Sequence, residues 1–243
     1  QKHQLKLKFR MNKLLFSILL VTNTFLIVKT QVVQTGENIA IANTESGKVR
    51  GYIRNNIFVY KGIPYAEAER FEAAHKPKSW EGIRSSLTWG PVPYLETPMT
   101  MTMINDEVEF LYDHNFGYAS EDCLRLNIWT PGLNDGKKRP VMFWLHGGGF
   151  TVGSSQELPS YDGENLAKKG NVVIVTINHR LNVLGFLDLS AYGEKYKYSA
   201  NNSILDIRVA LEWVKNNISN FGGDPNNVTI FGQSGGGGKV NAM

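Results

Sequence analysis

The chain has 243 residues, of which 42% are hydrophobic and 20% charged, and this composition excludes a disordered protein. Its net charge of +4 arises at the start of the chain, where Lys2, Lys6, Lys8, Arg10 and Lys13 all precede residue 14. Because the rest of the chain is near neutral, the charge indicates no nucleic-acid or acidic-lipid partner.

Residues 11–30 have the pattern of a signal peptide. Lys13 is followed by a mostly apolar run over 14–28, which is shorter than the ~20 residues needed to span a membrane. The pattern predicts a secreted or periplasmic protein without a stable membrane anchor. Residues 1–10 lack an initial Met and precede this complete signal, so we interpret them as read-through from upstream of the true start.

Short strands are predicted in the first half of the remaining chain. The segments are "IAIA" (39–42), "KVRGYI" (48–53), "IFVYKGIPYA" (57–66) after a turn at Asn55-Asn56, and "CLRLNIW" (123–129). The last segment alternates apolar and polar residues, which predicts a half-buried strand with Cys123 as a structural thiol. We expect these strands to form an antiparallel leading part of a sheet.

The second half alternates strands and helices. "PVMFWLH" (140–146) and "NVVIVTIN" (171–178) are almost continuously apolar, which is typical of strands buried on both faces. Apolar residues at helical spacing over 204–218 predict a helix that Gly222-Gly223 stops. A turn at 224–227 and a short buried strand, "VTIF" (228–231), complete an α/β pattern with a largely parallel sheet.

Ser234 lies in the pattern G-x-S-x-G, formed by Gly232-Gln233-Ser234-Gly235-Gly236 directly after the last predicted strand. A sharp strand-to-helix turn holds such a serine in a strained backbone conformation, and neighbouring segments pass close to it. The residues two before and two after it must therefore lack bulk, as these glycines do. The pattern predicts a nucleophilic serine.

The segment "WLHGGGF" (144–150) follows another predicted buried strand. Its glycines would let backbone N–H groups approach a substrate, as acyl transfer requires for the oxyanion of its tetrahedral intermediate. His146 is interpreted as a structural residue that packs or hydrogen-bonds beneath this loop. The same interpretation applies to His179, whereas His75 and His114 are expected at the surface.

These segments together resemble the type-B carboxylesterases, the cholinesterase-like branch of the α/β-hydrolases. The matching blocks include "SEDCLRLNIWTP", "VMFWLHGGGFTVGS", "VVIVTINHRLNVLGFL" and "LDIRVALEWVKNNISNFGGDPNNVTIFGQSGGG". The resemblance implies that residues 31–243 are the N-terminal part of one α/β-hydrolase domain, interrupted after the nucleophile elbow. It also implies that Ser234 is the acyl-forming nucleophile and that Gly148, Gly149 and Gly235 supply the oxyanion hole.

The resemblance further implies two ion pairs, Arg70 with Glu121 and Arg180 with Asp206.

The sequence also departs from the family pattern. The cysteine with which Cys123 often pairs in the family is absent, so Cys123 should be free. Glu-Ser-Ala is frequent in the family where this chain has Gln233-Ser234-Gly235. The stretch between Ala66 and Arg70 is also shorter than is usual in the family. This shortened, disulfide-free form resembles bacterial members more than animal ones.

A serine nucleophile needs a histidine base and an acid, which follow the serine in α/β-hydrolases. The nine residues after Ser234, "GGGGKVNAM", contain no Asp, Glu or His, and every histidine of the chain precedes Ser234. The acid and the histidine are therefore expected beyond residue 243, and this piece by itself is expected to be inactive.

The leading interpretation is a serine esterase acting on small-molecule esters, with no cofactor and no metal. Two alternatives remain at this point. One is a non-catalytic, cholinesterase-like binding or adhesion module, and the other is a related hydrolase of amides or lactones. The sequence indicates neither the natural ester nor the oligomeric state.

Overall fold

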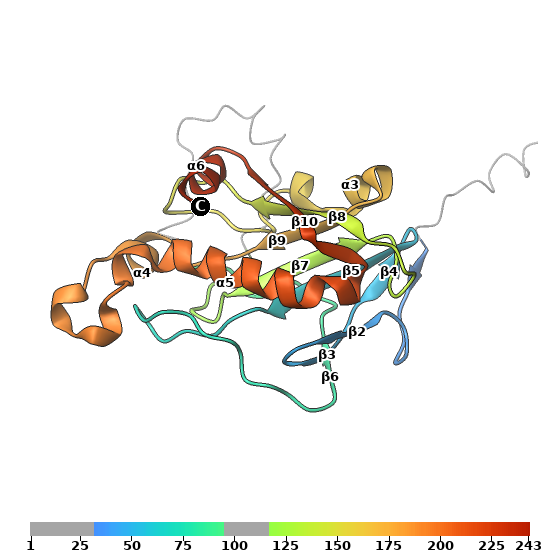
Figure 1. The fold of residues 1–243 in the computed structure, drawn as a ribbon, viewed down its shortest axis with the longest axis horizontal. Coiled ribbons are helices and arrows are strands. Elements are labelled where there is room, and N and C mark those ends of the chain that lie inside the picture. Colours follow the sequence, from blue (N-terminus) through green and yellow to red (C-terminus); the bar gives the residue numbers. More distant parts are fainter. Residues whose placement is uncertain (1–31, 95–116) are drawn as a thin grey trace, which may run out of the picture. The chain divides into compact units, whose positions relative to one another are not determined.

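A seven-stranded mixed sheet forms the centre of the unit Val33–Met243 (Figure 1). The computed structural model describes residues 32–94 and 117–243, so the predicted read-through, signal peptide and His114 lie outside the described residues. In spatial order the strands are β1 (Val33–Gln34), β4 (Tyr52–Arg54), β5 (Ile57–Pro64), β7 (Arg125–Thr130), β9 (Val173–Ile177), β8 (Arg139–Leu145) and β10 (Gly223–Gly232).

The strand directions divide this sheet into two parts. All pairings from β1 through β9 are antiparallel, whereas β8 pairs in parallel with both β9 and β10. The hairpin between β4 and β5 turns at Asn55 and Asn56, whose φ angles of 51° and 67° suit asparagine in a tight turn. The fold class is therefore α/β with antiparallel N-terminal strands, as predicted.

A separate three-stranded sheet contains β2 (Ile41–Thr44), β3 (Gly47–Arg50) and β6 (Ile83–Ser85). The predicted strand "KVRGYI" is in fact two strands, because the chain passes from β3 in this sheet to β4 in the main sheet at Gly51. A Cβ at Gly51 would overlap the carbonyl oxygen of Val59. The sequence pattern did not reveal this break.

Helices cover both faces of the main sheet. The α-helices are α3 (Glu164–Gly170), α4 (Asn182–Phe186), α5 (Asn202–Asn217) and α6 (Gly235–Ala242). The 3-10 helices are η1 (Pro159–Tyr161), η2 (Ser190–Tyr192), η3 (Glu194–Tyr196), η4 (Ser199–Asn201) and η5 (Ile218–Phe221). Figure 1 shows α5 along one side of the strands and α3 on the other.

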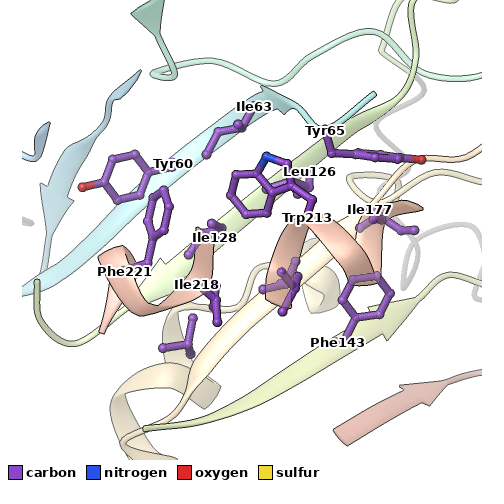
Figure 2. Packing of buried hydrophobic residues seen from close by; sticks show 14 of the residues in the cluster. Tyr60, Ile63, Tyr65, Leu126, Ile128, Phe143, Ile177, Trp213, Ile218 and Phe221 are labelled. Atoms are coloured by element: carbon purple, nitrogen blue, oxygen red, sulfur yellow. The ribbon is translucent and has the colours of Figure 1, made fainter. Parts of the chain in front are cut away.

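The larger core cluster lies between the sheet and the α5–η5 segment. Figure 2 shows Trp213, Ile218 and Phe221 from that segment meeting Tyr60 and Ile128 from the strands. Side chains on the other face of the sheet, such as those of Trp129 in β7 and Ile174 in β9, pack with Ala167 of α3 in a second cluster. The predicted helix over 204–218 is confirmed, but α5 begins two residues earlier and continues as η5.

Two burial predictions were wrong. The β7 strand is buried on both faces because a core cluster packs on each side, with Ile128 in one and Trp129 in the other. Its polar residue Asn127 bonds the hydroxyls of Ser155 and Thr176, each at 3.0 Å. Conversely, "VTIF" belongs to a longer strand, β10, that is only half-buried. It ends the spatial order of the sheet and therefore pairs on one side within the described residues.

The predicted turn at 224–227 also falls within β10. The pairing register shifts between Gly223 and Val228, and the side chain of Asp224 accepts a 2.9 Å hydrogen bond from the Asn226 amide. The predicted turn is therefore present, but as an irregularity within the strand. Among the described residues, no helix is both long enough and apolar enough to cross a membrane.

Candidate active site

Ser234 lies between β10 and α6, at the N-cap position of the helix. Its φ of 54° and ψ of −122° are sparsely populated for a residue with a side chain, and such a conformation costs about 1–3 kcal/mol. Its side chain is exposed, and its carbonyl oxygen accepts a 3.1 Å bond from the Gly238 amide. The surrounding structure thus fixes a strained, accessible serine at a strand-to-helix turn.

The glycines on either side of this turn leave no room for a methyl group. A Cβ at Gly232 would lie 2.6 Å from the carbonyl carbon of Gly236 and 2.8 Å from the Leu145 carbonyl oxygen. A Cβ at Gly236 would overlap that same oxygen of Leu145, the last residue of β8. Close packing of the turn against β8 therefore explains both glycines of the G-x-S-x-G pattern.

The glycine loop after β8 has the backbone freedom that the sequence predicts. Gly148 and Gly149 have φ angles of 85° and 62°, which disfavour any residue with a Cβ. The Val152 amide donates to the Gly148 carbonyl at 3.1 Å, and the Asn182 amide donates to the Phe150 carbonyl at 2.9 Å. Nothing lies within 4 Å of a Cβ built on Gly149, so this residue borders open space.

The structure brings this loop to the elbow. A Cβ at Gly235, the residue after Ser234, would overlap the carbonyl oxygen and Cα of Gly149. Ser234, Gly235 and Gly149 are therefore neighbours, and Gly148 adjoins them along the loop. These are the residues that the sequence predicts for the nucleophile and the oxyanion hole.

His146 and His179 lie buried beneath the glycine loop, where their rings stack with centroids 4.9 Å apart. The Nδ1 atom of His146 bonds the Gly147 carbonyl at 2.9 Å, and that of His179 lies 2.9 Å from the Ser203 hydroxyl. Burial lowers the pKa of His146 to about 3 and also lowers that of His179. Both histidines are structural, as predicted, and His75 is exposed, as predicted.

Comparison with known proteins shows the family of this chain. The model of the carboxylesterase family matches residues 38–243, which is most of the chain. The chain belongs to the carboxylesterase family. The α/β-hydrolase fold of this family is also that of the solved carboxylesterase structures it resembles.

Bacterial esterases are among its relatives. The chain is 41% identical over 207 residues to the para-nitrobenzyl esterase of Bacillus subtilis (strain 168), covering 84% of this chain and 40% of that protein. It matches a solved esterase from the anaerobe Clostridium hathewayi with a TM-score of 0.79 and 48% identity, over 86% of this chain and 41% of the other. It also matches a solved carboxylesterase from Geobacillus stearothermophilus with a TM-score of 0.72 and 45% identity, over 83% of this chain and 39% of the other.

The chain thus spans about 40% of the length of these carboxylesterases. Both ion pairs expected from the family resemblance are present. Buried Arg180 donates two hydrogen bonds to Asp206, from Nη2 at 2.6 Å and from Nε at 2.9 Å, and the exposed Arg70 bonds Glu121 through Nε at 2.9 Å. Cys123 is free, as predicted, but it is fully buried and not half-buried, and burial raises the pKa of its thiol.

Sequence reasoning missed one residue beside this candidate site, Lys239 of α6. Its side chain is buried, and its Nζ donates a 2.8 Å hydrogen bond to the carbonyl oxygen of Gly149. The available signal was a single lysine within the glycine-rich segment "GGGGKV", five residues after Ser234. No group of three or more His, Cys, Asp or Glu residues in the described part of the chain has the spacing of a metal site.

Proposed function

We propose that the full-length protein is a serine hydrolase that cleaves carboxylic esters through an acyl-enzyme on Ser234. The observation that carries this proposal is the exposed Ser234, held at φ 54° against the glycine loop that contains Gly149. Membership of the carboxylesterase family supports ester hydrolysis as the general activity. Small-molecule esters are the proposed substrates.

The proposed reaction has two half-reactions on one serine. The Ser234 hydroxyl loses its proton to a histidine base and attacks the ester carbonyl carbon, and the alcohol leaves with that proton. Backbone N–H groups of Gly148, Gly149 and Gly235 donate to the oxyanion, where loss of one such donor costs about 2.7–4 kcal/mol. Water then attacks the acyl-enzyme by the reverse sequence and releases the acid.

The base and the acid are proposed to lie in the part of the protein beyond residue 243. His146 and His179 are unsuited to the role, because both are buried and the lowered pKa of each ring makes it a weak proton acceptor. Their Nε2 atoms are buried and have no hydrogen-bond partner among the described residues, so neither ring bonds the Ser234 hydroxyl. The 243-residue chain alone is therefore proposed to be inactive.

A chromogenic short-chain ester, such as a p-nitrophenyl ester, tests this proposal. The full-length protein should hydrolyse it, Ser234→Ala should reduce turnover to background, and the 243-residue chain should show background turnover only. Ser234-dependent turnover by the 243-residue chain near the rate of the full-length protein would exclude the proposed location of the base. Full activity of Ser234→Ala would exclude the proposed nucleophile.

The alternatives make different predictions in the same assay. A non-catalytic binding module should hydrolyse no ester, although it would retain the fold. A related amidase or lactonase should prefer the amide or the lactone with the same acyl group, while still depending on Ser234. The exposed, strained Ser234 beside the glycine loop favours a catalyst over a binding module, because strained backbone conformations cluster at active sites.

Export is also part of the proposal. Residues 11–30 are proposed to direct the protein out of the cytoplasm, and residues 31–243 to begin the mature enzyme domain. Fractionation of cells that express the full-length protein with and without residues 11–30 tests this. The proposal requires that only the version with the segment appears outside the cytoplasm and that it is shortened at its N-terminus.

A further inference from the structure

Lys239 is a buried lysine on the helix that follows the elbow. Its side chain is fully removed from solvent, although lysine is almost never buried without a partner. Burying an ammonium group costs free energy that its contacts must offset.

The contacts of Lys239 lead to the glycine loop. Its Nζ lies 2.8 Å from the carbonyl oxygen of Gly149 and 5.3 Å from the centre of the Phe150 ring. The hydrogen bond to the carbonyl is charge-assisted, and such bonds are roughly twice as strong as neutral ones. The ammonium group thus binds the two residues that follow Gly148 in the loop.

The same carbonyl oxygen also contacts the elbow. Lys239 comes four positions after Gly235, so the two residues lie on one face of α6. A Cβ on Gly235 would overlap the Gly149 oxygen, so glycine at position 235 leaves the space in which that oxygen lies. One face of α6 therefore fixes Gly149 twice, by close backbone approach at Gly235 and by the ammonium of Lys239.

No carboxylate within residues 32–94 and 117–243 explains the burial of Lys239 as an ordinary ion pair. No salt bridge to Lys239 is found among the described residues, and the nearby His146 and His179 have pKa values that its positive charge lowers further. Burial lowers the pKa of Lys239 to about 8, so the charged form still predominates at neutral pH. The carbonyl of Gly149 is thus the principal polar partner that the structure gives this ammonium group.

We propose that Lys239 is a positioning residue of the oxyanion hole, which holds the Gly149 carbonyl and thereby sets the direction of the neighbouring backbone N–H groups. This inference rests on the proposed function, because it concerns the loop assigned there to the oxyanion. Lys239 itself does not touch the substrate. Its effect is on the rate of the chemical step, since small displacements of oxyanion donors weaken transition-state stabilisation more than substrate binding.

Steady-state kinetics of the full-length protein test the proposal. Lys239→Met keeps the length of the side chain but removes the donor, and it should lower kcat by about 10- to 100-fold with KM changed less than about twofold. Lys239→Arg retains a charged donor and should recover much of this loss. Lys215→Met, which removes an exposed positive charge from α5, is the matched control and should leave kcat unchanged.

The concentration of active sites in each variant is determined by titration, so that a smaller folded fraction does not appear as a lower kcat. A purely structural Lys239 would lower the melting temperature while kcat per active site stayed at the wild-type value, and that result overturns the proposal. If Lys239→Met does not fold, Lys239→Gln serves instead. Its side chain is one atom shorter and cannot reach the Gly149 oxygen, so the same loss of kcat is expected.

A double-mutant cycle with Gly235→Ala provides the second test. The added methyl group must displace the Gly149 carbonyl, and Lys239 resists that displacement. Gly235→Ala should therefore reduce kcat by a larger factor in the wild type than in the Lys239→Met background. Strictly multiplicative effects of the two substitutions contradict the proposed connection through Gly149.

The two levels of proposal fail differently. If Ser234→Ala abolishes turnover but Lys239→Met has normal kcat, the esterase proposal stands and the role of Lys239 is rejected. If Ser234→Ala retains turnover, the proposed function is rejected, and the role of Lys239 is rejected with it. Loss of kcat in Ser234→Ala and its partial, arginine-recoverable loss in Lys239→Met support both.

Discussion

At the residue scale, the elbow distinguishes two adjacent glycines by the space around them. A Cβ at Gly236 would overlap the Leu145 carbonyl oxygen, whereas the nearest atom to a Cβ at Gly237 is 3.7 Å away. Both residues lie in α6, where alanine is favoured over glycine by about 0.5–1 kcal/mol when space allows. Their substitution should therefore have opposite consequences.

We predict that Gly236→Ala destabilises the full-length protein and strongly reduces the proposed esterase activity, because the elbow must move away from β8. Gly237→Ala should retain activity and raise the free energy of unfolding by about 0.5–1 kcal/mol. Urea denaturation with the ester assay on both variants gives the comparison. Equal stability of the two variants would contradict the packing described for Gly236.

The buried and exposed ion pairs should also differ in their contribution to stability. Asp206 is fully buried and accepts two hydrogen bonds from the Arg180 side chain and one from its amide at 3.0 Å. Asp206→Ala leaves the Arg180 charge without its partner and should cost about 3–5 kcal/mol of unfolding free energy. Glu121→Ala, which removes the partner of exposed Arg70, should change stability little.

Chemical denaturation of these two variants measures the difference. If Asp206→Ala and Glu121→Ala shift the denaturation midpoint equally, burial does not determine the strength of these pairs. A double variant, Arg180→Met with Asp206→Ala, is a further control. It should recover part of the loss, since no charge then remains buried alone.

At the scale of elements, the stacked histidines connect the ends of two central strands. His146 directly follows β8, and His179 comes two residues after β9. The folded protein keeps His146 neutral until its pKa of about 3, whereas an unfolded chain takes up the proton below about 6.5. The free energy of unfolding should therefore decrease as the pH falls from about 6.5 towards 3. Above pH 6.5 the folded protein keeps the full stability that it has with His146 neutral.

We predict that His146→Gln makes the free energy of unfolding depend less steeply on pH below about 6.5. The variant is expected to be less stable at pH 7 but to lose stability less steeply between pH 6.5 and 4 than the wild type. Denaturation midpoints at several pH values give the two slopes. A residual slope is expected because the pKa of His179 is also lowered. Identical slopes for variant and wild type would show that His146 does not titrate as described.

The pattern of apolar residues predicted the types of most elements but not their neighbours. Near-continuous apolar runs correctly identified β8 and β9, and helical spacing correctly identified α5. Alternation in "CLRLNIW" wrongly indicated an exposed face, because the polar network around Asn127 is itself covered. Burial depends on what packs against a strand, and a local pattern does not contain that information.

At the scale of the whole molecule, β10 forms one of the two edges of the main sheet within the described residues. It pairs with β8 on one side, and its residues are half-buried or exposed beyond Gly223. An edge strand with free backbone groups readily pairs with another chain. The 243-residue chain expressed alone should therefore self-associate.

Size-exclusion chromatography of the 243-residue chain tests this prediction. We expect aggregates or dimers, and Thr229→Lys, which places a charge at an exposed position of β10, should shift the chain towards the monomer. A monodisperse monomer of the unsubstituted chain would contradict the role assigned to this edge.

The candidate site could be predicted from the sequence wherever a residue type is imposed by backbone geometry. Ser234 and its flanking glycines, and Gly148 and Gly149, stand in recognisable patterns because only glycine fits there. Lys239 could not be predicted, because its significance depends on contact with the Gly149 carbonyl, 90 residues earlier in the chain. Long-range contacts of single residues leave no local pattern.

The most direct test of the account is reaction of the full-length protein with a fluorophosphonate, followed by mass spectrometry of its peptides. An activated serine reacts with this reagent, whereas an ordinary hydroxyl does not. The account predicts one modified residue, Ser234, with loss of ester hydrolysis in proportion to labelling and no labelling of Ser234→Ala. An ester-hydrolysing protein that is unlabelled, or is labelled at another residue, would contradict it.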